Sequence, residues 1–262
     1  MNMLLTVDIG NSCISAGVFD AGDMKAVFSL STVLGRTSDE YGILLKEALS
    51  SAGIGPGMVK AVIACSVVPS LVPVMRRAIN RYIGPEPVFV SEDVAPRIKA
   101  LVDAPLEVGA DRLVNALAAY RRFNCALIVV DIGTAATFDL VSVDGSFMGG
   151  AIAPGPGLAA KALFEKTAKL PMVDVVKTSG VIGKNTSSAM CSGIFWGFAA
   201  MVDGMIERMA GEAHPTGQRP MTVVTGGFAG LFAPVCRHID ATDEYLTLKG
   251  LKIIYDEAVN DN

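Results

Sequence analysis

Two aspartates in this sequence occupy the same place in a repeated pattern that suits the binding of phosphates or cations. Asp8 follows the apolar run LLTV and precedes Ile-Gly-Asn, and Asp131 follows LIVV and precedes Ile-Gly-Thr. A carboxylate at the end of a buried strand must be hydrogen-bonded or bind a cation, because burying it without a partner is costly. The glycine two residues later lets the backbone approach a ligand, and successive N–H groups there can point at phosphate oxygens. We therefore expect the two loops to clamp the phosphates of a nucleotide.

Each copy taken alone has a simpler interpretation, an ordinary β-hairpin turn. Two copies in register, about half a chain apart, favour the functional interpretation. The sequence contains no Gly-x-x-x-x-Gly-Lys-Ser/Thr motif, which excludes the P-loop mode of phosphate binding. Thr225-Gly226-Gly227 follows another short apolar run, and its paired glycines could let the backbone approach a base or ribose. On its own this third segment is only a turn.

A second group of chemically capable residues opens a predicted helix at Gly109-Ala110-Asp111-Arg112. Asp111 lies in the first turn, near the positive end of the helix dipole. A kinase that acts on a hydroxyl needs a proton acceptor, and an acidic substrate needs an anion clamp. Asp111 and Arg112 could supply both, or they could be a helix-start carboxylate beside an exposed cation. The local sequence leaves both interpretations open.

The repeated segments, residues 4–20 and 127–143, predict two β-hairpins, each with a first strand buried on both faces. Strands and helices alternate in the rest of the chain. The pattern predicts strands over 61–65, 88–90 and 221–225, and helices over 41–52, 74–82, 111–123, 158–163 and 187–209, the last ended by Gly211. This alternation indicates α/β layers in two related lobes, residues 1–122 and 123–262.

The composition limits the classes of function. A formal net charge of -4 over 262 residues gives no electrostatic reason to expect a nucleic acid or an anionic membrane as partner. The five cysteines contain no CxxC pair, which indicates reduced, mostly buried thiols and a cytoplasmic protein. His214 and His238 lack the spacing of zinc ligands from any cysteine and are expected in solvated loops. The N-terminal apolar run is interrupted by Asp8, as in a strand rather than a signal peptide, and the apolar segment 193–206 is expected to be a buried helix.

Ten blocks of this sequence, in one order over nearly its whole length, resemble those of type III pantothenate kinases. They are DIGNS at 8–12, RTSDEY at 36–41, SVVP at 66–69, EVGADRLVNALAAY at 107–120, VVDIGTAATFD at 129–139, GGAIAPG at 149–155, TAKLP at 167–171, GKNTSSAMCSGIFWGF at 183–198, TGGFA at 225–229 and LTLKGL at 246–251. The resemblance implies the acetate and sugar kinase/Hsp70/actin fold, with two ribonuclease-H-like domains. It also implies transfer of a phosphoryl group from ATP to pantothenate, which gives 4′-phosphopantothenate in the first step of coenzyme A biosynthesis.

The resemblance also implies roles for individual residues. The loop formed by Asp8, Ile9, Gly10, Asn11, Ser12, Cys13, Ile14 and Ser15 would bind the ATP phosphates, with Asp8 acting through Mg²⁺. Asp131 would coordinate the monovalent cation, K⁺ or NH₄⁺, that the family requires, and Thr134 would contact ATP. Asp111 would be the general base on the primary hydroxyl of pantothenate. Gly109, Ala110 and Arg112 would help to hold pantothenate, and Thr186 would reach it from the neighbouring subunit of a homodimer.

The sequence departs from the family in the segment before Gly109. Members usually have Tyr-x-Asn-Pro there, and the tyrosine contacts pantothenate, whereas this chain has Val102-Asp103-Ala104-Pro105. A basic residue usual before the RTSDE block is replaced in the run Ser29-Leu30-Ser31, and Ser12 stands where threonine is usual. Two alternatives to a pantothenate kinase therefore stay open. One is a kinase-like binding protein of the Bvg accessory factor type, and the other is a kinase for a different small hydroxy acid.

Overall fold

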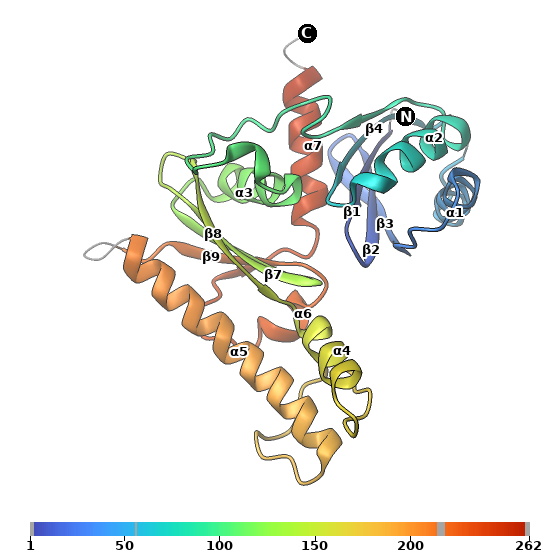
Figure 1. Ribbon diagram of the computed structural model, residues 1–262. Coiled ribbons are helices and arrows are strands. Elements are labelled where there is room, and N and C mark those ends of the chain that lie inside the picture. The colour runs from blue at the N-terminus through green and yellow to red at the C-terminus, as the bar shows by residue number, and fades with distance from the viewer. Residues whose placement is uncertain (1–2, 56, 214–217, 260–262) are drawn as a thin grey trace. The chain divides into compact units, whose positions relative to one another are not determined.

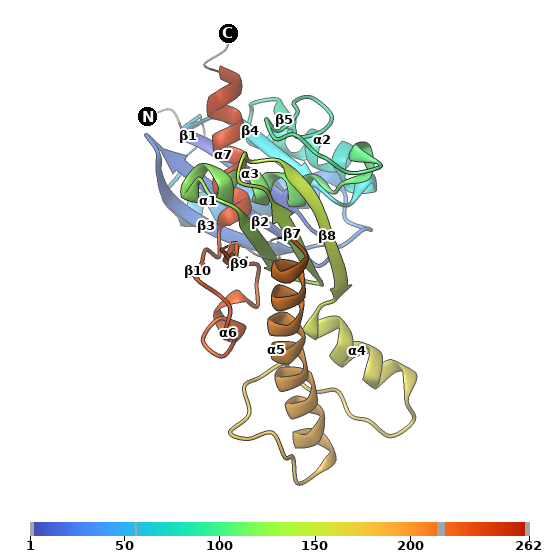
Figure 2. The ribbon, with the colours of Figure 1, turned by 90° about the vertical axis from the view of Figure 1, so that its left-hand side faces the viewer.

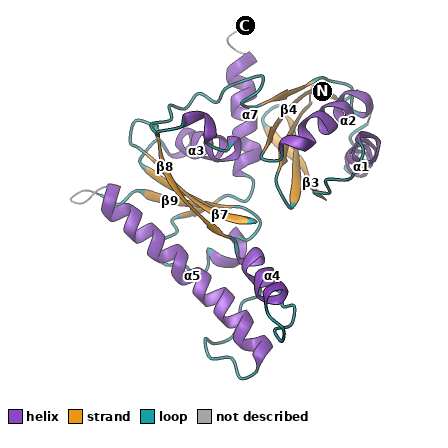
Figure 3. Cartoon of the chain, viewed as in Figure 1, coloured by secondary structure: helices purple, strands orange, loops and turns teal. Residues whose placement is uncertain are grey.

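The computed structural model describes residues 3–55, 57–213 and 218–259 (Figure 1). Contacts divide the chain into two compact units. Unit 1 comprises the residues up to Arg97, Leu106–Ala118 and the residues from Thr247 onward, and unit 2 comprises Ile98–Pro105 and Ala119–Leu246. Each unit contains one five-stranded sheet with helices packed on it (Figure 3). The predicted lobe boundary between residues 122 and 123 stays a prediction.

The sheet of unit 1 has the strand order β3-β2-β1-β4-β5. Its strands are β1 (Met3–Ile9), β2 (Cys13–Asp20), β3 (Asp23–Ser31), β4 (Val59–Ser66) and β5 (Pro87–Phe89). The first three strands are antiparallel neighbours, and β4 and β5 run parallel to β1. Parallel strands need a crossover, and helices supply it here.

Helices α1 (Ser38–Ser51) and α2 (Val72–Tyr82), the latter after a short 3₁₀ turn at Pro69–Leu71, pack with one face of this sheet in a single apolar cluster. Side chains alternate between the faces of a strand, so Leu5, Val7 and Ile9 all point into that cluster. The core also contains Tyr41, Leu45, Met75 and Ile79, each fully buried or nearly so. Thr37 begins α1 with a capping box to Glu40, which satisfies two backbone N–H groups at the helix start.

The opposite face of the same sheet carries Thr6 and Asp8. Helix α7 (Leu246–Val259) contacts this face, since Leu248 lies so close to Gly17 that an added Cβ would be 3.2 Å from its Cδ1. The start of α3 (Ala110–Phe123) packs against α7 in turn. An added Cβ on Gly250 would be 2.6 Å from Cγ1 of Val114, so the glycine permits the close helix contact.

Unit 2 repeats this sheet. Its strand order is β10-β9-β6-β7-β8, with β6 (Leu127–Ile132), β7 (Ala135–Val141), β8 (Phe147–Pro154), β9 (Met221–Thr225) and β10 (Ala241–Thr242). Strands β6, β7 and β8 are antiparallel neighbours, and β9 runs parallel to β6 as β4 does to β1. The same order and directions in both sheets confirm the predicted fold of two related ribonuclease-H-like sheets.

Helix α5 (Thr186–Ala213) lies along one face of the second sheet, with α4 (Pro156–Lys166) beside it (Figure 2). Its fully buried Phe195 and Val202 belong to one apolar cluster with the β6 and β7 side chains, and Phe232 of the short helix α6 (Ala229–Phe232) stacks on Phe195 at 5.2 Å. The indole N–H of Trp196 donates a 3.0 Å hydrogen bond to the Thr178 hydroxyl.

Among the described residues, α5 is the one helix long and apolar enough to cross a membrane by length and composition. Half of its most apolar stretch is buried inside the structure. The buried residues are those that pack on the sheet, the arrangement typical of a core helix. The predicted burial of residues 193–206 therefore holds for one face of the helix only.

Several details differ from the elements predicted. The strands β3, β8 and β10, the helices α6 and α7, and the 3₁₀ turns at Pro69–Leu71 and Pro105–Glu107 were not among them. Helix α5 continues through Gly211 to Ala213, because a helix tolerates a glycine that no other signal reinforces. Of the five free cysteines, Cys65 alone is buried and Cys13 is exposed, so the expectation of mostly buried thiols was wrong.

Candidate functional site

The first repeated hairpin places Asp8 at the point where the β1–β2 pairing ends. Ile9 pairs with Ile14, and the turn between them is closed by the Gly10 N–H donating to the Cys13 carbonyl at 3.0 Å. The side chains of Asn11, Ser12 and Cys13 are exposed. The predicted phosphate loop is therefore an exposed turn with a partly buried carboxylate at its base.

Two further groups in unit 1 act on Asp8. Cys65 is its partner in the parallel pairing of β1 with β4, and its thiol lies 3.3 Å from Oδ1 as a hydrogen-bond donor. Asp111, at the start of α3, acts on Asp8 through its charge. Burial and then the Asp111 charge raise the pKa of Asp8 to about 7, and the Cys65 hydrogen bond opposes them.

Asp111 is held against the start of its own helix. Its Oδ1 accepts a 2.8 Å hydrogen bond from the Arg112 N–H and lies where a Cβ on Gly109 would be only 2.6 Å away. The glycine therefore leaves room for the carboxylate. Burial raises the pKa of Asp111, and the Arg112 amide and guanidinium partly oppose that rise. Unit 1 thus brings together the predicted phosphate loop, Cys65 and the predicted Gly109–Arg112 group.

The donor set at Asp8 fits a magnesium ion that is shared with a nucleotide. Mg²⁺ is usually bound by one or two protein carboxylates together with substrate phosphates and water. The pKa values of Asp8 and the nearby Asp111 are raised, so their ionised forms are disfavoured. A cation bound between them would stabilise the ionised forms. The described residues contain no cluster of three or more histidine, cysteine or acidic side chains that could hold a metal alone, and His214 lies outside them. A metal at this position would need ligands from its substrate.

The second hairpin has a turn one residue shorter than the first. Ile132 pairs with Ala136, leaving three residues between them where the first hairpin has four, and the Gly133 N–H donates to the Ala135 carbonyl at 3.0 Å. Thr134 is exposed at the tip of this turn. The two copies of the motif therefore form turns of different shape.

The carboxylate of Asp131 lies in a crowded backbone cradle in unit 2. The turn after β9 contains Gly226 with φ +92°, a conformation that favours glycine. A Cβ there would come 2.3 Å from Oδ1 of Asp131 and 2.7 Å from the Ile132 carbonyl oxygen. Carboxylate and carbonyl oxygens are ligands that a cation such as K⁺ accepts. The predicted turn at Thr225-Gly226-Gly227 is confirmed as a turn.

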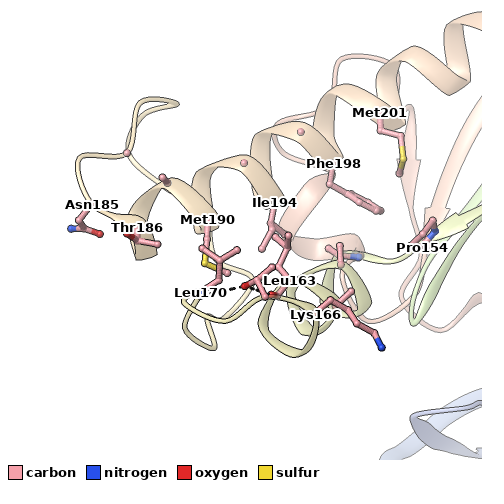
Figure 4. Close-up of a pocket in the computed structure, with 18 of the residues that line it drawn as sticks. Pro154, Leu163, Lys166, Leu170, Asn185, Thr186, Met190, Ile194, Phe198 and Met201 are labelled. Atoms are coloured by element: carbon pink, nitrogen blue, oxygen red, sulfur yellow. Dashed lines mark hydrogen bonds between the residues drawn. The ribbon is translucent and has the colours of Figure 1, made fainter.

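Thr186 lies at the exposed start of α5, beside a large apolar groove in unit 2. The groove has a volume of about 1100 Å³ and runs between α4 and α5. Met190, Ile194 and Phe198 line one side, facing Leu163 and residues that follow α4 (Figure 4). The sequence did not predict this groove, because α4 and α5 are joined by a long segment without helix or strand and no local pattern shows how the two helices pack.

Cys65 is a residue of the candidate site that the sequence did not predict. It stands in the run ACSVVP, one residue before a block that resembles the family. The signal that could have found it is strand register, since the last residues of two adjacent parallel strands lie side by side. That register is visible only once β1 and β4 are paired.

Solved structures with this fold include a putative Baf family transcriptional activator from Campylobacter jejuni, with a TM-score of 0.59 at 19% identity over 98% of this chain and 99% of that one. Component A of an (R)-2-hydroxyglutaryl-CoA dehydratase from Acidaminococcus fermentans gives 0.53 at 15% identity, covering 99% and 100%. A putative N-acetylglucosamine kinase from Porphyromonas gingivalis gives 0.53 at 12%, covering 97% and 99%. The fold is that of the acetate and sugar kinase/Hsp70/actin superfamily, as predicted.

The model of the type III pantothenate kinase family matches residues 4–208. A type III pantothenate kinase of Geobacter sulfurreducens is 43% identical over 254 residues, covering 97% of this chain and 98% of that protein. One from Anaeromyxobacter sp. (strain K) is 44% identical over 255 residues, covering 97% and 99%. The chain belongs to the type III pantothenate kinase family and is therefore a phosphotransferase.

Proposed function

We propose that this chain phosphorylates pantothenate at the expense of ATP, giving 4′-phosphopantothenate, the first intermediate of coenzyme A biosynthesis. The observation that carries the proposal is the juxtaposition of Asp8 and Asp111 in unit 1. One carboxylate stands at the base of an exposed turn suited to phosphates, and the other opens a helix beside Arg112. Phosphoryl transfer to a hydroxyl needs a metal-bound phosphate and a proton acceptor close together, and these two residues supply the positions for both.

The loop from Asp8 to Ser15 binds the ATP phosphates in this proposal. Its backbone N–H groups and the Ser12 hydroxyl donate to phosphate oxygens, and Asp8 holds Mg²⁺. The metal, when bound, neutralises charge on the phosphates and so favours transfer. Asp8 becomes ionised once the cation is present, although burial disfavours its charge in the free protein.

Asp111 accepts the proton of the pantothenate hydroxyl. Its raised pKa suits this task, because a base is most effective when its pKa approaches the working pH. The Arg112 guanidinium binds the pantothenate carboxylate, since Arg pairs well with planar anions. Gly109 leaves the space into which Asp111 folds, and Ala110 places the helix start against the substrate.

Asp131 holds a monovalent cation, K⁺ or NH₄⁺, and Thr134 contacts ATP. The support is the pair of oxygen atoms, one of the Asp131 carboxylate and one of the Ile132 carbonyl, that Gly226 allows to lie close to its backbone. A monovalent cation here would supply positive charge for nucleotide phosphates without demanding strict geometry.

The working form is a homodimer in which Thr186 reaches the pantothenate site of the neighbouring subunit. A dimer is supported by the apolar groove between α4 and α5 and by exposed apolar side chains near it, including Phe164 and Ile182, the latter 88% exposed. Apolar patches of this extent are typical of interfaces. The proposed compartment is the cytoplasm, which agrees with five free cysteines.

ADP release by the purified protein, with ATP, Mg²⁺ and pantothenate, tests the function. Turnover is expected only with pantothenate present, and it should require K⁺ or NH₄⁺. Turnover with another hydroxy acid but not with pantothenate would favour the alternative kinase. Tight ATP binding without turnover under any cation would favour the binding-protein alternative and contradict the proposal.

A further inference from the structure

The segment that follows β3 is hydrogen-bonded to the turn of the phosphate loop. Thr32, the first residue after this strand, makes two hydrogen bonds to the loop. Its hydroxyl donates to the Gly10 carbonyl at 2.7 Å, and its backbone N–H donates to the Ser12 carbonyl at 3.1 Å. Two alternate carbonyl groups of the turn are thus directed toward one residue.

These two bonds decide where the loop N–H groups point. In a trans peptide the carbonyl of one residue and the N–H of the next point in opposite directions. Because the Gly10 and Ser12 carbonyls point to Thr32, the N–H groups of Asn11 and Cys13 point away from it. Two N–H donors aimed outward from an exposed turn form an anion-binding concavity.

Thr32 is in turn held by the block RTSDEY, whose residues take no part in the catalytic steps of the proposed function. The Tyr41 side chain is fully buried, and its hydroxyl accepts from the Val33 N–H at 2.8 Å and donates to the Val33 carbonyl at 3.0 Å. Arg36 donates through its guanidinium to the Ser31 carbonyl at 3.1 Å. The residues on both sides of Thr32 are therefore held by hydrogen bonds, Val33 to a residue of α1 and Ser31 to a residue of the segment just before α1.

The second hairpin provides an internal comparison. Gly155, the first residue after β8, occupies the place that Thr32 occupies after β3, and its N–H donates to the Thr134 carbonyl at 2.9 Å. A Cβ on Gly155 would lie 2.1 Å from the Gly133 carbonyl oxygen. The shorter turn thus rests directly on the strand end, where no side chain fits. In the longer turn the equivalent backbone contact is similar, at 3.1 Å, but there is room for the Thr32 side chain, whose hydroxyl donates to the Gly10 carbonyl.

We propose that Thr32, held in place by Tyr41, is the positioning residue that sets the phosphate loop for ATP. This inference rests on the proposed binding of ATP phosphates by the loop from Asp8 to Ser15, and it assigns the 31–41 segment the task of fixing that loop.

Thr32→Val tests this, because valine keeps the shape of threonine and removes the hydroxyl donor. The KM for ATP should rise about tenfold, equivalent to about 1.4 kcal/mol, with little change in kcat at saturating ATP. Thr32→Ser should restore most of the affinity. Tyr41→Phe, which keeps the ring in the core, should raise the KM for ATP in the same sense.

Thr6→Val is the matched control. The Thr6 hydroxyl also donates to a glycine carbonyl of the same sheet, that of Gly17 at 3.2 Å, but this carbonyl belongs to the middle of β2. This variant should lose thermal stability and keep the KM for ATP. A KM in Thr32→Val within twofold of wild type, or an equal rise in Thr6→Val, would overturn the proposal.

Calorimetric titration with ATP and Mg²⁺ separates this inference from the proposed function. If the wild type binds ATP but does not phosphorylate pantothenate, the function fails, and the Kd of Thr32→Val still tests the loop. If the wild type phosphorylates pantothenate and Thr32→Val binds ATP normally, only the loop inference fails. A wild type that does not bind ATP would overturn both.

Discussion

The thiol of Cys65 donates a hydrogen bond to the carboxylate of Asp8, at 3.3 Å between Sγ and Oδ1. Both side chains stand at the ends of adjacent parallel strands and on the same face of the sheet. Burial and the charges of Asp8 and Asp111 raise the pKa of Cys65 well above its usual range, so the thiol keeps its proton and remains a donor. This hydrogen bond engages one oxygen of the Asp8 carboxylate, Oδ1, and so limits how the side chain can turn.

Replacing Cys65 should therefore weaken the binding of ATP with Mg²⁺. Cys65→Ala removes the donor, and the Kd should rise about threefold to tenfold, as for the loss of one hydrogen bond. Cys65→Ser keeps a donor of similar size and should stay near wild type. Calorimetry gives both constants. Equal binding by the alanine and serine variants at wild-type strength would show that the thiol does not orient Asp8.

Asp8 should make the free protein less stable as pH rises. Its pKa is raised from 3.8 to about 7 in the folded chain, so between these values the unfolded carboxyl is ionised while the folded one still holds its proton. Stability is greatest below the lower value and falls as pH rises through the higher one. Asp8 is partly exposed, so the loss should be roughly 1–2 kcal/mol.

Asp8→Asn removes this ionisation. Compared with wild type, the variant should unfold at a higher temperature near pH 8 and at about the same temperature near pH 4. Thermal unfolding without nucleotide measures both. A stabilisation of equal size at the two pH values would mean that the Asp8 charge is not its source.

Asp111→Asn should abolish most of the turnover and leave ATP binding largely intact. Loss of a general base commonly costs on the order of 10²–10⁴-fold in rate. Steady-state ADP release and calorimetric ATP titration give the two quantities. Asp23→Asn, at the exposed first residue of β3, is a matched control that should keep the wild-type rate. A near-normal rate in Asp111→Asn would reduce Asp111 to a helix-start residue.

The groove between α4 and α5 should be part of the dimer interface. Leu163 lines it and is 38% exposed, so Leu163→Glu places a charge on the apolar surface without disturbing the core. Analytical ultracentrifugation should then show monomer. Leu106→Glu, at a fully exposed leucine in unit 1, makes the same chemical change elsewhere and should leave the dimer intact. A wild type that sediments as a monomer would contradict the proposed homodimer.

Bound ATP should protect Cys13 from alkylation. This cysteine is exposed in the phosphate loop, whereas Cys65 is buried and its thiolate is disfavoured. N-ethylmaleimide should therefore modify Cys13 readily and Cys65 very slowly, as followed by peptide mass spectrometry. ATP with Mg²⁺ should slow the reaction at Cys13, and pantothenate alone should not. Labelling of Cys13 that is unaffected by saturating ATP would place the nucleotide elsewhere.

The sequence predicted the two hairpins and the helices between them because both have clear periodicity. It missed β3, β8 and β10, which are edge strands. Alternating exposed residues weaken the apolar signal of β3, and Gly149 and Gly150 weaken that of β8. Helix α7 was also missed. Its apolar residues recur at helical spacing, but Gly250 near its start is typical of a turn. The contact with Val114 explains that glycine, and no local signal could have done so.

The candidate site was predictable where a motif carries it. Asp8, Asp131 and Asp111 each stand two residues from a glycine in short runs, so their types and spacing mark them as candidates, while their separate roles were predicted from the resemblance to the family. Cys65 and Thr32 could not be found in this way. Each acts through strand pairing or a turn with a residue far along the chain, and such neighbours depend on register rather than on local composition.

The two turns of unequal length also bear on how the halves of this chain could be exchanged. Thr32 would collide with the shorter turn, where even a Cβ is excluded, and Gly155 has no hydroxyl to donate to the Gly10 carbonyl of the longer one. If the two strand ends were exchanged, each hairpin would therefore lose the contact that holds its turn. Although the two sheets share one topology, their turns have become non-interchangeable parts, and a chimera that duplicated either half should inherit one well-formed turn and one ill-fitting one.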